Sequence, residues 1–233
     1  MSATEPVQFH LANPPPGVIV VQSKGEFVGG GVTGIVERLP SGDVVKTPLE
    51  FPDDPGLDCA RDITIEAEIY QMLGEHSRLV KLRSWDPVQH ELVLEYMQNG
   101  TLKQYIRDHL AEITPQLRIR WARQAVEGLQ LLHAADLELK IADFGGSSVN
   151  GSRASVCPGI RYKTPDLDWR KPPTLAEDLF SLGSLFYFIF TGNVPFHDLE
   201  EEEVEDKFRA GVFPDLSGVP CADIIALCWK QAR

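Results

Sequence analysis

The sequence predicts an α+β fold of two lobes, a small β-rich lobe followed by a mainly α-helical one. Short runs of β-branched residues, separated by turn sequences, fill most of the first hundred residues. Beyond the turn sequence Gln98-Asn99-Gly100, apolar residues recur at helical spacing. We therefore expect a flexible leader at 1–16, a first lobe at 17–98 and a second lobe at 99–233.

Composition narrows the class of protein. The chain has 233 residues, of which 43% are hydrophobic, so it is long enough to bury substantial cores. Its formal charge of -12 argues against binding nucleic acid or an anionic membrane, because both require a basic surface. The longest apolar run, 179–190, contains Ser181, Gly183 and Ser184 and is shorter than the roughly 20 residues that span a bilayer, so it predicts a buried helix.

Neither the N-terminal residues nor the cysteines indicate that the protein is exported. Residues 1–16 lack the basic and apolar regions of a signal peptide. The four cysteines have no CxxC spacing, which favours reduced thiols in a cytoplasmic or nuclear protein over a disulfide framework or a zinc site.

The first lobe is expected to begin with a β-strand at 17–21 and to turn at the glycines 29–31. Strands at 35–39 and 43–46 then form a hairpin through Pro40-Ser41-Gly42-Asp43. A helix follows, with Asp62 as its expected N-cap. Its predicted apolar face is made by Ile65, Ile69, Met72 and Leu73.

Two more strands, at 80–85 and 91–97, complete this lobe before the turn at Gly100. In the second lobe the apolar periodicity predicts five helices, one of which has Pro115 near its start, where proline is tolerated. These helices are expected at 102–110, 116–133, 175–190, 200–211 and 222–230.

Three groups of residues suggest a phosphate site in the first lobe. Gly29, Gly31, Gly34 and Val36 fit the pattern GxGxxGxV. A dinucleotide fingerprint would open a helix, whereas these glycines lead into a strand, so a hairpin whose backbone N–H groups approach phosphates is favoured. Twelve residues after Gly34, Val44-Val45-Lys46 ends in a lysine that could pair with phosphates. On the following helix, Glu66 is the candidate partner of Lys46, with Glu68 as the alternative.

Further motifs follow in order along the chain. Residues 91–97 are predicted to form a buried strand and the start of the connection that follows it. Residues 139–145 are predicted to form a strand that leads into Asp143-Phe144-Gly145. The segment 159–166, the helix start at 177–183 and Leu227-Cys228-Trp229 come next.

Taken together, these motifs resemble a eukaryotic protein kinase domain from about Phe27 to Trp229. The resemblance implies a protein kinase-like fold that uses ATP and Mg²⁺, with Asp143 as metal ligand and Leu94 as gatekeeper. It implies that the Glu95 carbonyl and the Met97 N–H contact adenine. The ATP-binding residues implied are Gly29, Gly31, Gly34, Val36, Val44, Lys46, Glu66, Leu94, Glu95 and Met97.

One part of the family pattern does not fit. Only nine residues separate His133 from Asp143. The family's catalytic loop His-Arg-Asp-Leu-x-x-x-Asn takes about eight positions by itself, and the strand that enters Asp143 must come from the same nine residues. No catalytic residue can therefore be assigned, and the chain is predicted to be inactive or strongly impaired. Asp178, which braces that loop in the family, is expected to lose its partner, and the second lobe to be truncated near Arg233.

Three interpretations remain. The chain is an incomplete version of an active protein kinase, with Ser/Thr specificity expected for the complete parent. Alternatively it is a pseudokinase that binds nucleotide or acts as a scaffold, because Lys46 and Asp143 are retained. The third is an interaction domain, suggested by the acidic run 200–203. The partners expected are ATP and a protein substrate or scaffold partner, with no nucleic acid and no membrane.

Overall fold

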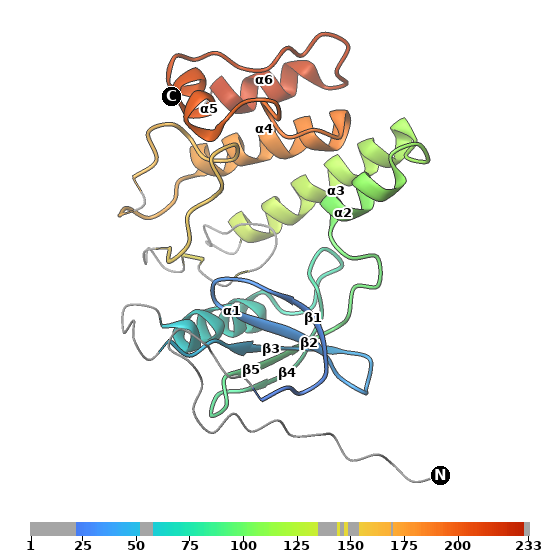
Figure 1. Ribbon diagram of the computed structural model, residues 1–233, viewed down its shortest axis with the longest axis vertical. Helices are drawn as coiled ribbons and strands as arrows, with labels where there is room; N and C mark the ends of the chain where they lie inside the picture. Colours follow the sequence, from blue (N-terminus) through green and yellow to red (C-terminus); the bar gives the residue numbers. More distant parts are fainter. Residues whose placement is uncertain are drawn as a thin grey trace.

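The computed structural model describes residues 22–51, 58–134, 144, 147–148, 154–168 and 170–230. A five-stranded sheet with one helix forms one lobe, and the remaining described helices form a second lobe above it (Figure 1). The chain passes from the sheet to the helices over residues 95–101. The α+β fold of two lobes predicted from the sequence is therefore confirmed.

The sheet is antiparallel throughout, with strand order β1-β2-β3-β5-β4. Its first strand lies at 26–30 and includes Gly29 and Gly30, so the expectation of a turn at 29–31 is wrong for these two residues. The strand expected at 17–21 lies outside the described residues. The strands are β1 Glu26–Gly30, β2 Gly34–Arg38, β3 Val44–Pro48, β4 Leu82–Asp86 and β5 Glu91–Leu94.

The turn between β2 and β3 follows the sequence prediction. The Leu39 N–H donates to the Asp43 carbonyl at 2.9 Å, and the Gly42 N–H donates to the Leu39 carbonyl at the same distance. Gly42 has a φ of 94°, a conformation that glycine adopts without the steric cost of a side chain. This hairpin fixes the register in which Val36 faces Lys46 on β3.

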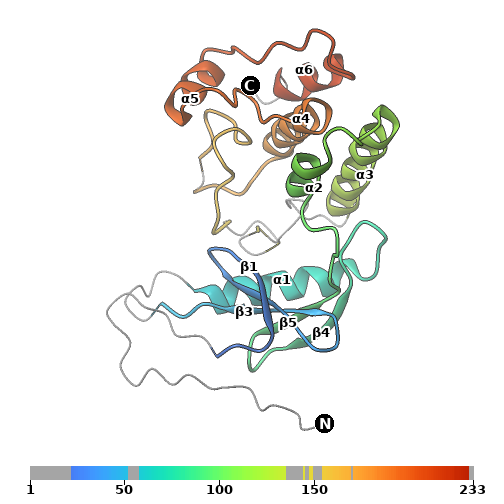
Figure 2. The ribbon, with the colours of Figure 1, turned by 45° about the vertical axis from the view of Figure 1, so that its right-hand side comes forward.

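Helix α1, Cys59–Leu73, packs on one face of the sheet, against β3, β4 and β5 (Figure 2). Its N-cap is Asp58, whose carboxylate accepts a hydrogen bond from the Arg61 N–H at 2.9 Å. The prediction that Asp62 caps the helix is wrong, because Asp62 lies inside the first turn and is buried. Met72 is exposed, so it does not share the buried face that includes Ile69.

Three helices of the second lobe begin at threonine side chains. Thr101, Thr114 and Thr174 accept hydrogen bonds from backbone N–H groups at the starts of α2, α3 and α4. The helices are α2 Leu102–His109, α3 Pro115–Ala134, α4 Leu175–Thr191, α5 Glu201–Arg209 and α6 Ala222–Lys230. No described helix is both long enough and apolar enough to cross a membrane.

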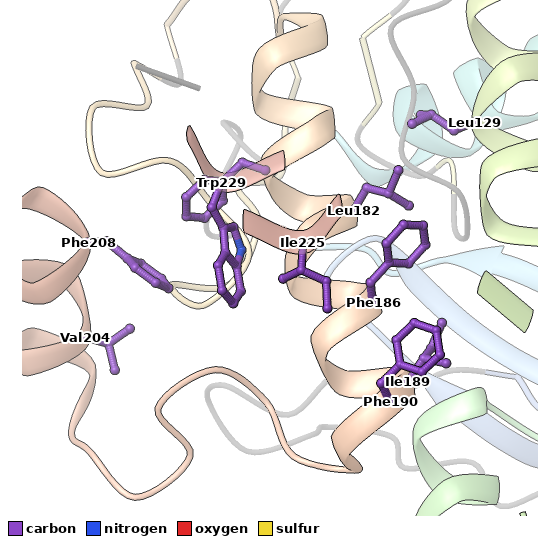
Figure 3. Close-up of a cluster of buried hydrophobic side chains, with 10 residues drawn as sticks. Leu129, Leu182, Phe186, Ile189, Phe190, Val204, Phe208, Ile225 and Trp229 are labelled. Carbon is purple, nitrogen blue, oxygen red and sulfur yellow. The ribbon is translucent and has the colours of Figure 1, made fainter. Parts of the chain in front are cut away.

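Helix α4 is the buried centre of the second lobe, as its apolar sequence predicts. Its apolar side chains point toward α3, α5 and α6 (Figure 3). Gly183 brings α6 close, because a Cβ at this position would stand 2.8 Å from the Cβ of Cys228. Trp229 on α6 is 1% exposed and donates through Nε1 to the Ser184 hydroxyl at 3.1 Å. The core residues are Leu129, Phe180, Leu182, Phe186, Ile189, Phe190, Val204, Phe208, Ile225 and Trp229.

Candidate functional site

A buried ion pair joins the sheet to α1. Lys46 lies on β3 and Glu66 on α1, and the Lys46 Nζ is 2.7 Å from the Glu66 Oε2. Their side chains are only 8% and 3% exposed. Glu68, the alternative partner, is exposed. The structure therefore selects Glu66, and the ion pair expected from the sequence is present.

Such a pair contributes little net stability. Removing two charges from water costs several kcal/mol per ion, roughly as much as their mutual attraction returns. Apolar side chains of similar volume would hold β3 and α1 together at least as well. The pair is therefore better explained by a requirement for a fixed cation on β3 than by stability.

Another carboxylate lies one turn before Glu66 on α1. Burial raises the pKa of the Asp62 carboxyl, while a hydrogen bond with the Ser155 side chain and the charges of Arg61 and Lys46 oppose the shift. Asp62 and Glu66 thus make the side of α1 that faces Lys46 acidic. Lys46 pairs with Glu66, and its charge also acts on the buried Asp62 carboxyl.

The glycines of the GxGxxG pattern have different structural requirements. A Cβ on Gly34 would stand 2.3 Å from the Thr47 carbonyl oxygen of β3, so only glycine fits there. A Cβ on Gly29 or Gly31 would meet nothing within 4 Å among the described residues. The Gly31 N–H donates to the Gly34 carbonyl at 2.9 Å and closes the turn. Packing therefore accounts for Gly34 and leaves Gly29 and Gly31 unexplained.

Strand β5 leads into the connection between the lobes. Leu94 is its last residue and pairs with Val44 on β3, so the strand is shorter than the predicted 91–97. The Glu95 N–H donates to the Lys81 carbonyl at 3.0 Å, and the Glu95 carboxylate accepts from the Lys81 N–H at 3.1 Å. Met97 is exposed, and its carbonyl accepts from the Gly100 N–H. Val44, Leu94 and the backbone of 95–97 thus border the same end of the sheet.

Phe144 packs against α1. It is 1% exposed, and its ring meets the Tyr70 ring edge-on with centroids 5.1 Å apart. Tyr70 stands one helical turn after Glu66, so the same face of α1 holds both the carboxylate and Phe144. Sequence analysis missed Tyr70, although its spacing from Glu66 was readable. Asp143, the predicted metal ligand, and residues 135–142 lie outside the described residues.

Arg161, also missed by sequence analysis, anchors the segment before α4. Its guanidinium donates to the Pro195 and Phe196 carbonyls at 3.0 and 3.3 Å and to the Leu199 carbonyl at 2.5 Å. The Ser181 hydroxyl of α4 donates to the Tyr162 carbonyl, and burial raises the pKa of the Tyr162 phenol. Asp178 is buried and does have an interaction partner, so the expectation that it would be unpaired is wrong.

Comparisons with known proteins identify this arrangement. A family model described as protein tyrosine and serine/threonine kinase matches residues 54–138, which include Glu66, Glu95 and Met97 but neither Lys46 nor Asp143.

Three relatives illustrate the similarity. The chain is 26% identical to a mitogen-activated protein kinase kinase kinase 5 of Arabidopsis thaliana, over 89% of this chain and 34% of the relative. It is 23% identical to a putative mitogen-activated protein kinase kinase kinase 7-like protein of Drosophila melanogaster, over 77% and 51%. It is 29% identical to a probable serine/threonine-protein kinase of Dictyostelium discoideum, over 76% and 40%.

The chain spans about a third to a half of the length of these relatives. All three are protein kinases by description, and the matches cover three quarters or more of this chain. The family model and these relatives support a eukaryotic protein kinase-family domain in this chain.

Proposed function

We propose that this chain binds ATP with Mg²⁺ where β3, the glycine turn and residues 94–97 meet. The observation that carries the proposal is the buried Lys46–Glu66 pair at 2.7 Å. A lysine held by a carboxylate presents a fixed positive charge to the α and β phosphates. The fit is supported by Gly29 and Gly31, at which a side chain would meet no described atom, so that open space beside the turn can take phosphate oxygens.

Each remaining residue has an assigned role in this proposal. Val36, Val44 and Leu94 border the adenine, and the Glu95 carbonyl and Met97 N–H bond its edge. Asp143 holds Mg²⁺, which neutralises phosphate charge when bound. Gly34 acts indirectly, because it lets β2 approach β3 closely enough to place the turn above Lys46.

We further propose that the chain itself transfers phosphoryl groups poorly or not at all. Positioning and charge stabilisation remain at Lys46 and Asp143, but the nine residues between His133 and Asp143 leave no place for the aspartate that accepts the substrate's proton. The complete parent is expected to phosphorylate serine or threonine hydroxyls, as the description of the Dictyostelium relative suggests for that protein.

The shortage of residues before Asp143 favours an incomplete kinase over a dedicated pseudokinase, because the motifs on both sides of it are retained. The pseudokinase reading is favoured by the retained Lys46–Glu66 pair. Genomic DNA between the codons for His133 and Asp143 decides between them. An in-frame stretch that encodes His-x-Asp and a later Asn supports the incomplete kinase, and its absence excludes it.

Titration of the full chain with ATP and Mg²⁺, followed by melting temperature, tests the site. Ligand that binds the folded state stabilises it by RT ln(1 + [L]/Kd), about 2.7 kcal/mol at a hundred times the Kd. A shift with ATP–Mg²⁺ that is absent in Asp143→Asn supports the proposal. A folded sample without any shift contradicts it. A parallel assay for phosphoryl transfer to a generic protein substrate is expected to give no signal above background.

The two classes of glycine make a matched pair. Gly31→Ala is expected to leave the free energy of unfolding nearly unchanged, since its Cβ meets nothing, but to weaken ATP binding by crowding the phosphates. Gly34→Ala is expected to destabilise the protein by about 1–3 kcal/mol, because the Thr47 carbonyl must move. Urea unfolding and ATP titration of both variants give the comparison. Equal ATP affinity in wild type and Gly31→Ala would contradict the assigned role of the turn.

A further inference from the structure

The glycine turn, residues 31–34, lies against the start of α1. In both ribbon views this turn between β1 and β2 is beside the N-terminal end of the helix (Figures 1 and 2). The Cys59 thiol in the first turn of α1 donates to the Val32 carbonyl, with 3.5 Å between Sγ and the oxygen. One turn further along α1, Ile63 packs closely on Gly34, because a Cβ at Gly34 would stand 3.2 Å from the Ile63 Cδ1. Two side chains of α1 therefore contact the turn.

The turn presents its backbone to α1. Val32 is 62% exposed, so its side chain extends into solvent while its carbonyl accepts from Cys59. The next residue, Thr33, is 4% exposed although it lies in the turn. The Gly31 N–H donates to the Gly34 carbonyl and closes the turn on itself. The position of this closed turn relative to the sheet and α1 thus depends on a bond to a backbone group.

Apolar packing alone does not account for Cys59. The residue is 4% exposed, yet it belongs to none of the hydrophobic clusters found among the described residues. Burial raises the pKa of its thiol and the Asp62 charge raises it further, while a hydrogen bond from the Leu49 N–H, just after β3, opposes the shift. The thiol therefore stays protonated near neutral pH, so it can donate to Val32 while its sulfur accepts from Leu49.

We propose that Cys59 is a positioning residue for ATP, because it holds in place the glycine turn beside which the phosphates are proposed to lie. This role rests on the ATP site proposed above. A turn that is fixed before the ligand arrives loses less conformational freedom on binding, so the ligand binds more tightly. The same helix carries Glu66, which fixes Lys46. Helix α1 therefore positions both the cation and the turn of the phosphate site.

Hydrogen exchange of the ligand-free full chain, together with titrations with ATP–Mg²⁺ and with adenosine, tests this role. Cys59→Ala removes both bonds of the thiol, Cys59→Val removes them at similar side-chain volume, and Cys59→Ser keeps a donor and an acceptor. Cys228→Ala, at a buried thiol of α6, is the matched control for loss of a buried sulfur. Adenosine has the adenine edge but no phosphates, so its affinity reports on the rest of the site.

Cys59→Ala and Cys59→Val are expected to weaken ATP–Mg²⁺ binding about fivefold, in the range of one hydrogen bond, and to leave adenosine affinity within about twofold. Amide exchange at residues 31–34 should become about fivefold faster in both variants, because the turn opens more easily. Cys59→Ser and Cys228→Ala should stay within about twofold of wild type in all three measurements. The valine variant keeps the test decisive if the cavity in Cys59→Ala lowers stability.

A folded wild type that binds neither ligand would contradict the ATP site and, with it, this positioning role. If the wild type binds ATP–Mg²⁺ and Cys59→Val keeps both the affinity and the exchange rate within about twofold, the ATP site stands and only the positioning role is overturned. Equal losses of ATP and adenosine binding, or an equal loss in Cys59→Ser or Cys228→Ala, would also overturn the role, since the bond to Val32 would then not be the cause.

Discussion

Lys46→Met is expected to abolish the stabilisation by ATP–Mg²⁺ and to lower the free energy of unfolding of the ligand-free protein. Glu66 is 2% exposed, so loss of the ammonium leaves its carboxylate buried without that counter-charge. Breaking one partner of a buried pair costs about 3–5 kcal/mol. Urea unfolding measures this loss, and melting temperature at increasing ATP–Mg²⁺ measures the loss of binding.

A double replacement separates the two effects. Lys46→Met/Glu66→Leu removes both charges and is expected to recover most of the stability, because apolar side chains of similar volume replace a buried pair at little cost. It is not expected to recover ATP binding, which needs the cation. Glu68→Gln, at the exposed neighbouring glutamate, is the control and should change neither quantity. ATP stabilisation that persists in Lys46→Met would contradict the proposed site.

Trp229→Ala is expected to be the most destabilising single change in the helical lobe. The indole is 1% exposed, stacks on Phe213 with centroids 5.2 Å apart and donates to Ser184 of α4. Truncation of a buried tryptophan costs about 3–5 kcal/mol through lost burial and the cavity that remains. The free energy of unfolding from urea titration gives the measurement.

Two comparisons show whether this loss arises from packing between α4 and α6. Trp229→Phe keeps an aromatic ring and loses the hydrogen bond to Ser184, so it should cost clearly less than the alanine variant. Trp85→Ala removes the same side chain from β4, where it is only partly buried, and should also cost less. A Trp229→Ala loss below about 1 kcal/mol, within the range of surface substitutions, would show that α6 does not hold this lobe together.

Local sequence chemistry was sufficient for most elements of the fold. The hairpin at 40–43 follows from turn residues, and the helices of the second lobe follow from apolar periodicity. The apolar run 179–190 was correctly read as a buried helix, because its length is far from that of a membrane span. The predicted N-cap of α1 was wrong because two nearby aspartates, Asp58 and Asp62, could each cap a helix that begins there.

Within the candidate site, the sequence supplied residue types and the tertiary structure assigned their contacts. The choice of Glu66 over Glu68 depends on which side of α1 faces β3, and two glutamates two positions apart cannot be told apart until that packing is known. Likewise, only the approach of β2 to β3 separates Gly34 from Gly31. The position of Phe144 under Tyr70 joins segments more than seventy residues apart.

By itself, the sequence determined the order of elements, the division into two lobes and the shortage of residues before Asp143, because spacing, turn chemistry and periodicity are properties of neighbouring residues. The tertiary structure alone decided which charges are buried and which are left to solvent, as with Arg118 against the core and Arg120 and Arg123 exposed on the same helix. The physical reason is desolvation: its cost depends on what packs against a group, and those partners come from distant parts of the chain.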